Sequence, residues 1–376
     1  MRGQLTNKLE HYTAELVRQG LHRQRQVDDP DEDVIHFSRN DYLSLATNLR
    51  IKKAYQQGFK RYPTGSGGSM VVCGYHGAHK ALERAFADAL GVDDCILFSS
   101  GYAANLSVIG LLARLDVHVL VDKRVHASIY DGLQSTGASY TRYLHNHLGD
   151  LSEKMKGVPQ DTVLMTEGLF SMSGQFAPLA EIAQLAQQDL QGLIVDEAHS
   201  FGLVGQQGMG AVSQYQLTQD VVPLRVIPFG KAFAAFGAIV AGHRTWIDAL
   251  LQSARPYIYS TAFSPAFAHG LLETLEVVRG ADEQRRKLRE LVRYFRAAID
   301  NSPLTWSDSH SPVQQLRLGC PQRALYFTER LRESSIVCLP MRQPTVSKQE
   351  TGLRVILNDH HQPEHIDFLF KCLHQI

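Results

Sequence analysis

The sequence has no long hydrophobic run. Its longest apolar stretch, from Ala232 to Gly242, is about half as long as a membrane-spanning helix. The first residues, Met1 to Leu5, include no apolar signal core. We therefore expect neither a membrane anchor nor a secretory signal.

Cysteine is scarce, and its spacing is irregular. The chain has five cysteines, an odd number, and no two of them have CxxC spacing. The pattern supports neither a disulfide framework nor a zinc site, so no metal is expected. A reducing, cytoplasmic location is the simplest interpretation.

The chain also lacks a net charge. Lys and Arg together number 38, and so do Asp and Glu, which gives a formal net charge of zero and a pI of about 7.3. Without a basic field, nucleic acid and anionic membranes are poor first hypotheses for a partner. A hydrophobic content of 44% and a length of 376 residues instead indicate a soluble globular protein of about two domains.

Short apolar runs alternate with helical segments through the middle of the chain. The expected strands are Cys95–Ser99, His118–Asp122, Thr162–Thr166, Leu193–Asp196, Leu224–Ile227 and Ala238–Ala241. The expected helices are His79–Leu90, Ala103–Arg114, Ser128–Thr136 and Leu179–Asp189. Because the apolar runs are unbroken, both faces of the strands should be buried. Strand–helix alternation predicts an α/β domain with a mostly parallel sheet.

The two ends of the chain are expected to lie outside this domain. Residues 1–44 should form an arm with a helix over 1–22, an acidic turn at 27–33 and a strand over 34–37. Residues 45–262 should form the large α/β domain. Residues 263–376 should form a long linking helix, about Pro265 to Ile299, and a small α+β domain. Its expected elements are strands at Val313–Leu318, Ile336–Leu339 and Leu353–Leu357 and helices at Pro321–Glu333 and Glu364–His374.

Polar residues follow two of the apolar strands, where ligands bind in parallel sheets. Asp196 comes directly after one strand, and His199 three residues later could reach the same site. Asp196 could equally cap a helix, and the pair would also suit a metal. Lys231 follows another strand and enters a run of small apolar residues. Poor solvation there favours the neutral amine of a Schiff-base lysine, although a lone lysine more often snorkels to water.

Two strand-to-helix turns complete the set. After Ser99-Ser100, the turn at Gly101 and Tyr102 offers free helix amides that favour a phosphate. His126 begins a helix near another strand end, where it could stack on a flat ring or be an ordinary surface histidine. A phosphate turn, a ring-stacking position, an acid and an amine together describe a site for pyridoxal 5′-phosphate (PLP). In this interpretation Asp196 keeps the pyridine nitrogen protonated, and His199 bonds the ring hydroxyl.

From Ser38-Arg39-Asn40-Asp41-Tyr42-Leu43 to Leu353-Arg354-Val355, the sequence resembles the α-oxoamine synthases. These fold-type-I PLP enzymes condense an amino acid with an acyl thioester and lose CO2. Four stretches resemble the biotin-pathway member most: Gly65-Ser66-Gly67-Gly68-Ser69, Thr166-Glu167-Gly168-Leu169-Phe170-Ser171-Met172, Ile258-Tyr259-Ser260-Thr261 and Arg342-Gln343-Pro344-Thr345-Val346. The resemblance implies an aminotransferase-like fold with a seven-stranded, mostly parallel sheet and a smaller C-terminal α+β domain.

The resemblance also implies roles for individual residues. Lys231, His126, Asp196 and His199 would be catalytic and contact PLP, with Ser171 near the ring and Gly101 and Tyr102 at the phosphate. Ser260 and Thr261 match a segment that reaches the cofactor of a neighbouring subunit, which implies a homodimer with shared active sites. The residues matched to substrate binding are Asn40, Arg342, Thr345 and Arg23. The implied substrates are L-alanine and a pimeloyl group carried by coenzyme A or by acyl-carrier protein.

The chain departs from the family pattern around the lysine. Pro228 stands where Thr or Ser is usual, and Ala232, Ala234 and Phe236 interrupt a segment that is usually glycine-rich. Met70 stands where many members have Arg, and His22, next to Arg23, aligns with an arginine that borders the substrate site. A glycine-using 2-amino-3-ketobutyrate ligase or a longer-chain α-aminoketone synthase would share the cofactor residues. A catalytically silent subunit and a metal-dependent hydrolase are the alternatives from other classes.

Overall fold

A computed structural model describes residues 2–25, 27 and 34–376, so all of the expected acidic turn except Val27 lies outside the described residues. The chain divides into two compact units. The small unit comprises Met1–Arg39, Met172–Gly174 and Lys287–Ile376, and the large unit comprises Asn40–Ser171 and Gln175–Arg286. The division expected from the sequence set residues 1–44 apart and began the C-terminal part at 263, whereas the contacts place 1–39 with the C-terminal residues and 263–286 with the large unit.

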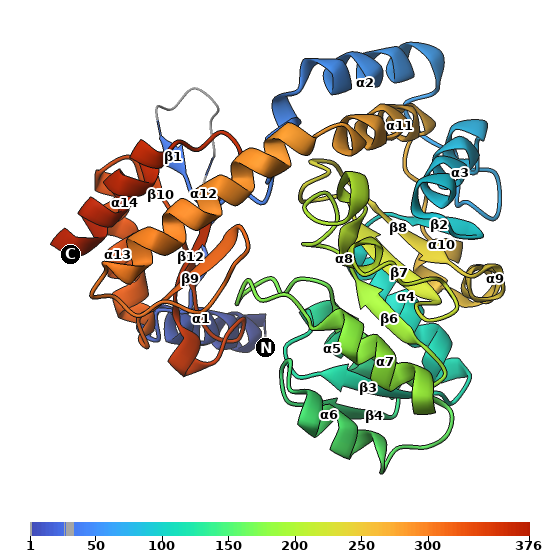
Figure 1. Cartoon of the computed structure of the whole chain (residues 1–376), viewed down its shortest axis with the longest axis horizontal. Helices are drawn as coiled ribbons and strands as arrows, with labels where there is room; N and C mark the ends of the chain where they lie inside the picture. Colours follow the sequence, from blue (N-terminus) through green and yellow to red (C-terminus); the bar gives the residue numbers. More distant parts are fainter. Residues whose placement is uncertain (1, 26, 28–33) are drawn as a thin grey trace. The chain divides into compact units, whose positions relative to one another are not determined.

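The large unit is built on a seven-stranded sheet (Figure 1). Its strands are β2 (Asp94–Phe98), β3 (His118–Asp122), β4 (Tyr140–Tyr143), β5 (Thr162–Glu167), β6 (Leu193–Asp196), β7 (Leu224–Pro228) and β8 (Ala238–Gly242). Their order is β2-β8-β7-β6-β5-β3-β4, and only β8 runs antiparallel to its neighbours. The expected α/β fold with a mostly parallel sheet is confirmed.

Burial explains which strands could be found from the sequence. Every residue of β3, β5, β6, β7 and β8 is buried, as their unbroken apolar runs predict. Strand β4 was not predicted, because its residues Tyr-Thr-Arg-Tyr include no aliphatic side chain and form no apolar run. This strand lies at the edge of the sheet and pairs only with β3, so most of it stays partly exposed.

Helices flank the strands of the large unit. They are α2 (Leu49–Arg61), α3 (Gly77–Leu90), α4 (Gly101–Arg114), α5 (Ala127–Thr136), α6 (Leu148–Met155), α7 (Leu179–Asp189), α8 (Gly210–Gln214), α9 (Arg244–Ser253), α10 (Arg255–Ile258) and α11 (Pro265–Arg279). Two of them begin with side-chain caps that matter for the site. The Ser100 hydroxyl accepts from the amide of Ala103 at the start of α4, and His126 Nδ1 accepts from the amide of Ser128 at the start of α5.

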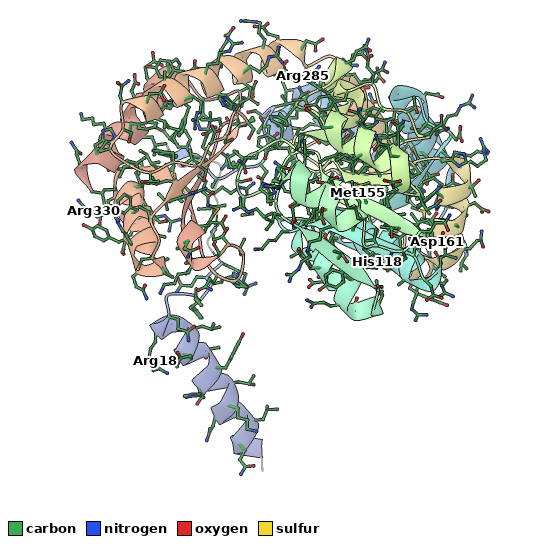
Figure 2. The ribbon with its side chains drawn as sticks, turned by 60° about the horizontal axis from the view of Figure 1, so that its bottom comes forward. Arg18, His118, Met155, Asp161, Arg285 and Arg330 are labelled. Carbon is green, nitrogen blue, oxygen red and sulfur yellow. The ribbon has the colours of Figure 1, made fainter. Side chains whose placement is uncertain are left out.

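The single long helix expected from Pro265 to Ile299 is wrong. The chain forms α11 and then α12 (Asp282–Asp300), separated by Gly280 and Ala281. The buried guanidinium of Arg285 donates to the carbonyl oxygens of Val278 (2.7 Å) and Arg279 (3.0 Å), the last carbonyls of α11. Arg285, labelled in Figure 2, therefore supplies partners that a continuous helix would have provided.

The small unit contains two sheets. An antiparallel sheet has the order β11-β12-β9, from β9 (Val313–Arg317), β11 (Leu339–Met341) and β12 (Gly352–Ile356). A parallel pair joins β1 (Ile35–His36) to β10 (Ile336–Val337). The single strand expected at Ile336–Leu339 is therefore wrong, because the chain changes partner at Cys338. The helices here are α1 (Arg2–Arg18), α13 (Pro321–Glu333) and α14 (Pro363–Gln375).

The helix α1, shorter than the expected 1–22, exposes most of its side chains (Figure 2). Leu5, Leu9 and Tyr12 are all more than half exposed. In the part of the chain that the structure describes, no helix combines the length and hydropathy needed to cross a membrane.

Candidate active site

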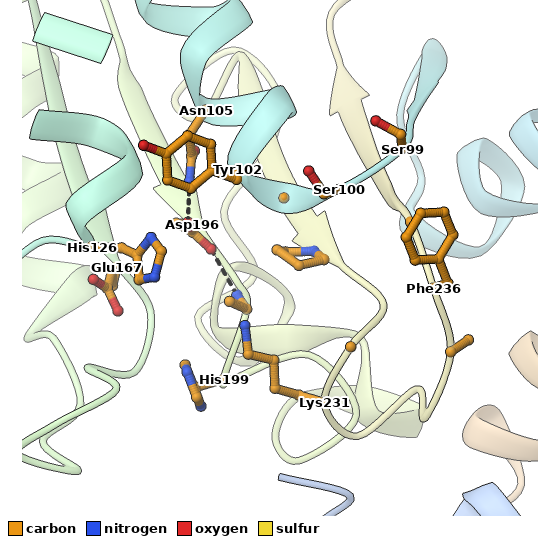
Figure 3. A pocket seen from close by; sticks show the side chains of 16 residues that line it. Ser99, Ser100, Tyr102, Asn105, His126, Glu167, Asp196, His199, Lys231 and Phe236 are labelled. Atoms are coloured by element: carbon orange, nitrogen blue, oxygen red, sulfur yellow. Dashed lines mark hydrogen bonds between the residues drawn. The ribbon is translucent and has the colours of Figure 1, made fainter. Parts of the chain in front are cut away.

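A cavity of about 290 Å³ opens in the large unit beside the carboxyl ends of β5, β6 and β7 and the start of α4 (Figure 3). Six of the residues singled out in the sequence line it: Gly101, Tyr102, His126, Asp196, His199 and Lys231. Residues from four separate strand ends thus meet around one space, as the parallel sheet predicts.

Asp196 is the last residue of β6 and is only 2% exposed. Its Oδ1 accepts from the amide of Ala198 (2.9 Å), and its Oδ2 accepts from Nδ2 of Asn105 (2.7 Å). Both donors are groups that cannot accept in return, so Asp196 is held as an acceptor on both oxygens. The carboxyl is oriented by the protein and lines the cavity.

His199 is buried, and its orientation is set by a tyrosine. The phenol oxygen of Tyr42 lies 2.6 Å from His199 Nδ1. Tyr42 is fully buried and comes from the segment that resembles the α-oxoamine synthases. The contact with Tyr42 orients the imidazole of His199 at the cavity wall.

Two contacts with Ser128 orient the imidazole of His126. Its Nδ1 accepts from the amide of Ser128 (3.2 Å) and from the Ser128 hydroxyl (2.8 Å). Burial lowers the pKa of His126, and this effect outweighs the opposing influence of Asp196. An imidazole that lines the cavity and is exposed in the single chain is suited to contact with a flat ring.

Lys231 follows β7, and its side chain points into the cavity toward Asp196 in Figure 3. Its charge acts on His126 and on Glu167, whose pKa it lowers against a larger raising effect of burial. The Lys231 carbonyl accepts from the amide of Ala234 (2.7 Å) in the turn that follows. The amine therefore faces the same space as the carboxyl and the two imidazoles.

The start of α4 provides donors for an anion. The first helical bond runs from the amide of Ala104 to Ser100, and Ala103 is bonded to the Ser100 hydroxyl. The amides of Gly101 and Tyr102 precede these bonds and remain as donors. A Cβ on Gly101 would lie 2.4 Å from Cγ of Pro228, so only glycine fits against the proline that replaces the usual Thr or Ser.

The donor set fits PLP. Free amides at the helix start suit its phosphate, Asp196 suits its protonated ring nitrogen, and Lys231 suits its aldehyde. Two buried acceptors in the cavity wall, Asn105 Oδ1 and Glu167 Oε1, have no hydrogen-bond partner within the described residues. A polar ligand is thus expected in this cavity, because buried polar atoms are rarely left unsatisfied.

Other predicted residues lie elsewhere. Ser260 and Thr261 line a second cavity of about 20 Å³, which Ser99 and Met70 also line. Ser171 is buried beyond the end of β5, and Asn40 is half-buried; neither lines the main cavity.

The remaining substrate candidates lie in the small unit. Arg342 donates from Nη1 to the carbonyl oxygens of Gly20 and His22. Burial lowers the pKa of Arg342, and the nearby charge of Arg23 adds to this effect. Thr345 donates its amide to the carbonyl of Arg342 (3.0 Å), and Arg23 is exposed.

Sequence reasoning missed Asn105, Ser128, Glu167 and the Tyr42 contact. Glu167 carries the signal that identified Asp196, since it also ends a buried strand, and the two are register partners in adjacent strands. Burial raises the pKa of Glu167 well above its usual range, and the charge of Asp196 adds to this. Within residues 2–25, 27 and 34–376, no group of three or more His, Cys, Asp or Glu side chains is placed to hold a metal ion.

Comparison with known proteins places the chain in a family. The profile described as aminotransferase class I and II matches residues 32–371. An 8-amino-7-oxononanoate synthase from Alkalilimnicola ehrlichii is 40% identical over 344 residues, which cover 91% of this chain and 88% of the relative. The solved 8-amino-7-oxononanoate synthase of Francisella tularensis is 30% identical, with a TM-score of 0.82 and coverage of 92% of this chain and 98% of that one.

A more distant solved structure shares the fold. A serine palmitoyltransferase from S. paucimobilis, with bound PLP and myriocin, is 24% identical, with a TM-score of 0.89 over 98% of this chain and 96% of that one. The chain therefore belongs to the aminotransferase class I and II family. Within it, the resemblance to the α-oxoamine synthases is confirmed, and the expected cofactor, PLP, is confirmed with it. The relatives that match most of its length at 30–40% identity include 8-amino-7-oxononanoate synthases.

Proposed function

We propose that this chain condenses L-alanine with a pimeloyl thioester to give 8-amino-7-oxononanoate, CO2 and a free thiol carrier, a step of biotin biosynthesis. The carrier is coenzyme A or acyl-carrier protein. The observation that carries the proposal is the convergence of Lys231, Asp196, His199 and the α4 amides on one cavity. The names of relatives that match nearly the whole chain support the choice of substrates.

Each residue of the cavity has a proposed role. PLP, when bound, supplies an electron sink that stabilises negative charge on the amino-acid Cα. Gly101 and Tyr102 hold its phosphate, Asp196 its ring nitrogen and His199 its ring hydroxyl. His126 covers the ring, and Ser171 lies close to it. Lys231 holds the aldehyde and, once released, takes the Cα proton of alanine.

The substrate carboxylate is assigned to Asn40 and Arg342, with Thr345 and Arg23 also assigned to substrate binding. Arg342 suits this role because its fork binds a carboxylate through two parallel bonds. The two partners described for its Nη1 are neutral carbonyl oxygens, which leave its positive charge uncompensated.

We also propose a homodimer in which Ser260 and Thr261 serve the partner subunit. Neither residue lines the Lys231 cavity. Because the resemblance places both residues at a cofactor, their position outside this cavity supports a role at the cofactor of the partner subunit. Apolar side chains near this segment, Val71, Val72 and Tyr259, are each nearly half exposed or more in the single chain. A partner would cover such surfaces.

A cytoplasmic location belongs to the same proposal. All five cysteines are free thiols, with Cys95, Cys338 and Cys372 buried. Free thiols persist in a reducing compartment.

The decisive assay offers the purified, PLP-loaded protein L-alanine, glycine and L-serine, each with short-chain, pimeloyl and long-chain thioesters. We expect 8-amino-7-oxononanoate, detected by mass spectrometry, with alanine and the pimeloyl thioester preferred. The Lys231→Ala variant should lose turnover and the absorbance of lysine-bound PLP. Lys123→Ala, at an exposed position of the same unit, is the matched control. Preference for glycine or for a long acyl chain would contradict the proposal, as would normal turnover by Lys231→Ala.

A further inference from the structure

A series of hydrogen bonds joins two residues that line the cavity, Asp196 and His126. Asn105 Nδ2 lies 2.7 Å from Asp196 Oδ2 and 2.9 Å from the hydroxyl of Ser128. That hydroxyl in turn lies 2.8 Å from Nδ1 of His126. Asn105 is in α4 and Ser128 in α5, so the chain links Asp196 to His126 through two helices (Figure 3 shows the bond from Asn105 to Asp196).

The direction of each bond follows from the chemistry of the groups. The Asp196 carboxylate can only accept, so the amide nitrogen of Asn105, rather than its oxygen, must face it. The two hydrogens of that nitrogen serve Asp196 and Ser128. The Ser128 hydroxyl accepts from Asn105, which leaves its own proton for His126 Nδ1.

A second donor supports the same state of the imidazole. The backbone amide of Ser128 also points at His126 Nδ1, at 3.2 Å, a longer contact than the 2.8 Å to the Ser128 hydroxyl. A proton on Nδ1 would oppose both donors, so the intact network favours the ring proton on Nε2, and without the donated hydroxyl proton only the longer amide contact disfavours the Nδ1–H form. The charged and titratable groups that act on this ring are Asp196, Lys231 and Asp131, and burial outweighs them in lowering the pKa of His126.

Burial increases the energetic cost of breaking this hydrogen-bond network. Ser128 is fully buried and Asn105 is 1% exposed, so water does not replace a lost partner at either residue. Breaking one bond would leave an unsatisfied donor or acceptor in a poorly solvated site, where each such group is costly. The network therefore has one arrangement in which every donor is used.

We propose that Asn105 and Ser128 are positioning residues that hold Asp196 and His126 in register and keep His126 in its neutral form with the proton on Nε2. The consequence for binding rests on the proposed function. There, the network aligns the acid at the cofactor nitrogen with the ring that covers it. It also keeps a second positive charge away from Lys231.

The test uses the full-length protein labelled with 15N-histidine, both as the PLP-loaded form and after removal of PLP. The ring nitrogen resonances of His126 are assigned by their loss in His126→Gln and are followed as a function of pH. Asn105→Ala and Ser128→Ala remove one member of the network each. Ser107→Ala is the matched control, because the buried Ser107 hydroxyl bonds only to the carbonyl of Ala103 within α4.

We expect wild type and Ser107→Ala to show only the Nε2–H form at neutral pH. Asn105→Ala should mix the two neutral forms and raise the titration midpoint of His126 by roughly 1 pH unit, because Ser128 Oγ becomes free to accept from a protonated Nδ1. Ser128→Ala should also mix the two neutral forms. It replaces Asn105→Ala as the test variant if Asn105→Ala does not fold. PLP should bind roughly 10-fold more weakly to both variants than to Ser107→Ala, as judged by its absorbance.

Identical His126 spectra and titrations in wild type and both network variants would overturn the inference. So would an Nδ1–H form in wild type. These readouts are available without PLP. If the protein binds no PLP or makes no aminoketone, the proposed function is wrong. The His126 titration still decides the role of Asn105 and Ser128 in that case.

Discussion

The phenol oxygen of Tyr42 lies 2.6 Å from Nδ1 of His199, and both side chains are buried. A hydroxyl that donates to Nδ1 leaves the ring proton on Nε2. In the proposed function, that proton is the donor to the ring oxygen of PLP. Tyr42 thus sets the hydrogen-bonding role of His199 without lining the cavity itself.

The Tyr42→Phe variant tests this relationship. Loss of the hydroxyl allows the Nδ1–H form of His199, which cannot donate from Nε2. We expect kcat/KM to fall roughly 10-fold, about 1.4 kcal/mol of lost stabilisation, with weaker PLP binding. The measurements are steady-state kinetics and a PLP absorbance titration. Tyr215→Phe, at an exposed tyrosine of the same unit, should leave both values unchanged; equal kinetics for the two variants would contradict the role of Tyr42.

Glu83 should make stability depend on pH. Burial raises the pKa of Glu83 from 4.5 to about 7, although hydrogen bonds from Tyr75 and from the Leu97 amide oppose the shift. The folded chain therefore binds this proton more tightly than the unfolded chain does. The resulting stabilisation is complete below pH 4.5 and is lost as the pH rises through about 7. Its size is about 3 kcal/mol.

The Glu83→Gln variant isolates this contribution, because glutamine keeps the shape but does not titrate. Urea denaturation of wild type and variant at pH 5 and pH 8 gives the difference between their free energies of unfolding. Wild type should lose about 2.5 kcal/mol relative to the variant between these two pH values, because a small part of the loss has already occurred at pH 5. A difference that stays constant with pH would show that Glu83 ionises normally in the folded chain.

Ala234 should be a site of backbone strain. Its φ of 49° is in the left-handed region, where a Cβ costs roughly 1 kcal/mol or more. The family usually has glycine in this segment. We expect Ala234→Gly to stabilise the protein by about 0.5–1 kcal/mol in chemical denaturation, after the higher entropy of the unfolded glycine is subtracted.

The neighbouring Ala235 provides the control for this substitution. Its φ is outside the left-handed region, so Ala235→Gly should destabilise the protein. Destabilisation by both variants to the same extent would show that the turn after Lys231 carries no such strain.

Mixed subunits test the shared active site. Lys231→Ala and the double variant Ser260→Ala/Thr261→Ala should each be nearly inactive. If Ser260 and Thr261 serve the partner, a mixed dimer has one intact site, and an equimolar mixture should recover about a quarter of wild-type turnover. Unfolding and refolding the two variants together forms the mixed dimers. Activity no higher than the sum of the two variants alone would place both functions in one subunit.

The sequence was informative where chemistry follows a strand. Asp196 and Lys231 could be found because Asp196 ends a buried strand and Lys231 follows another by three residues, and the parallel sheet brings such ends together. Asn105 and Ser128 could not be found in this way. They lie inside helices, 23 residues apart, and Asn105 is 91 residues from Asp196, so only the packed structure shows that they touch.

The same contrast holds for the fold. Strands such as β3 and β6 match their predicted bounds because their mostly apolar residues indicate burial. The break between α11 and α12 was missed, since helical periodicity continues across Gly280. At the break, Arg285 in the first turn of α12 donates to the carbonyls at the end of α11, a side-chain contact that helical periodicity does not predict.

The pairing of β1 with β10 has a consequence for biosynthesis of the chain. Ile35 bonds to Ser335 and Phe37 to Val337, three hundred residues downstream. As the ribosome extends the polypeptide, residues 40–286 can acquire their own core first. Strand β1 can pair only after β10 has been synthesised, which happens near the end of translation.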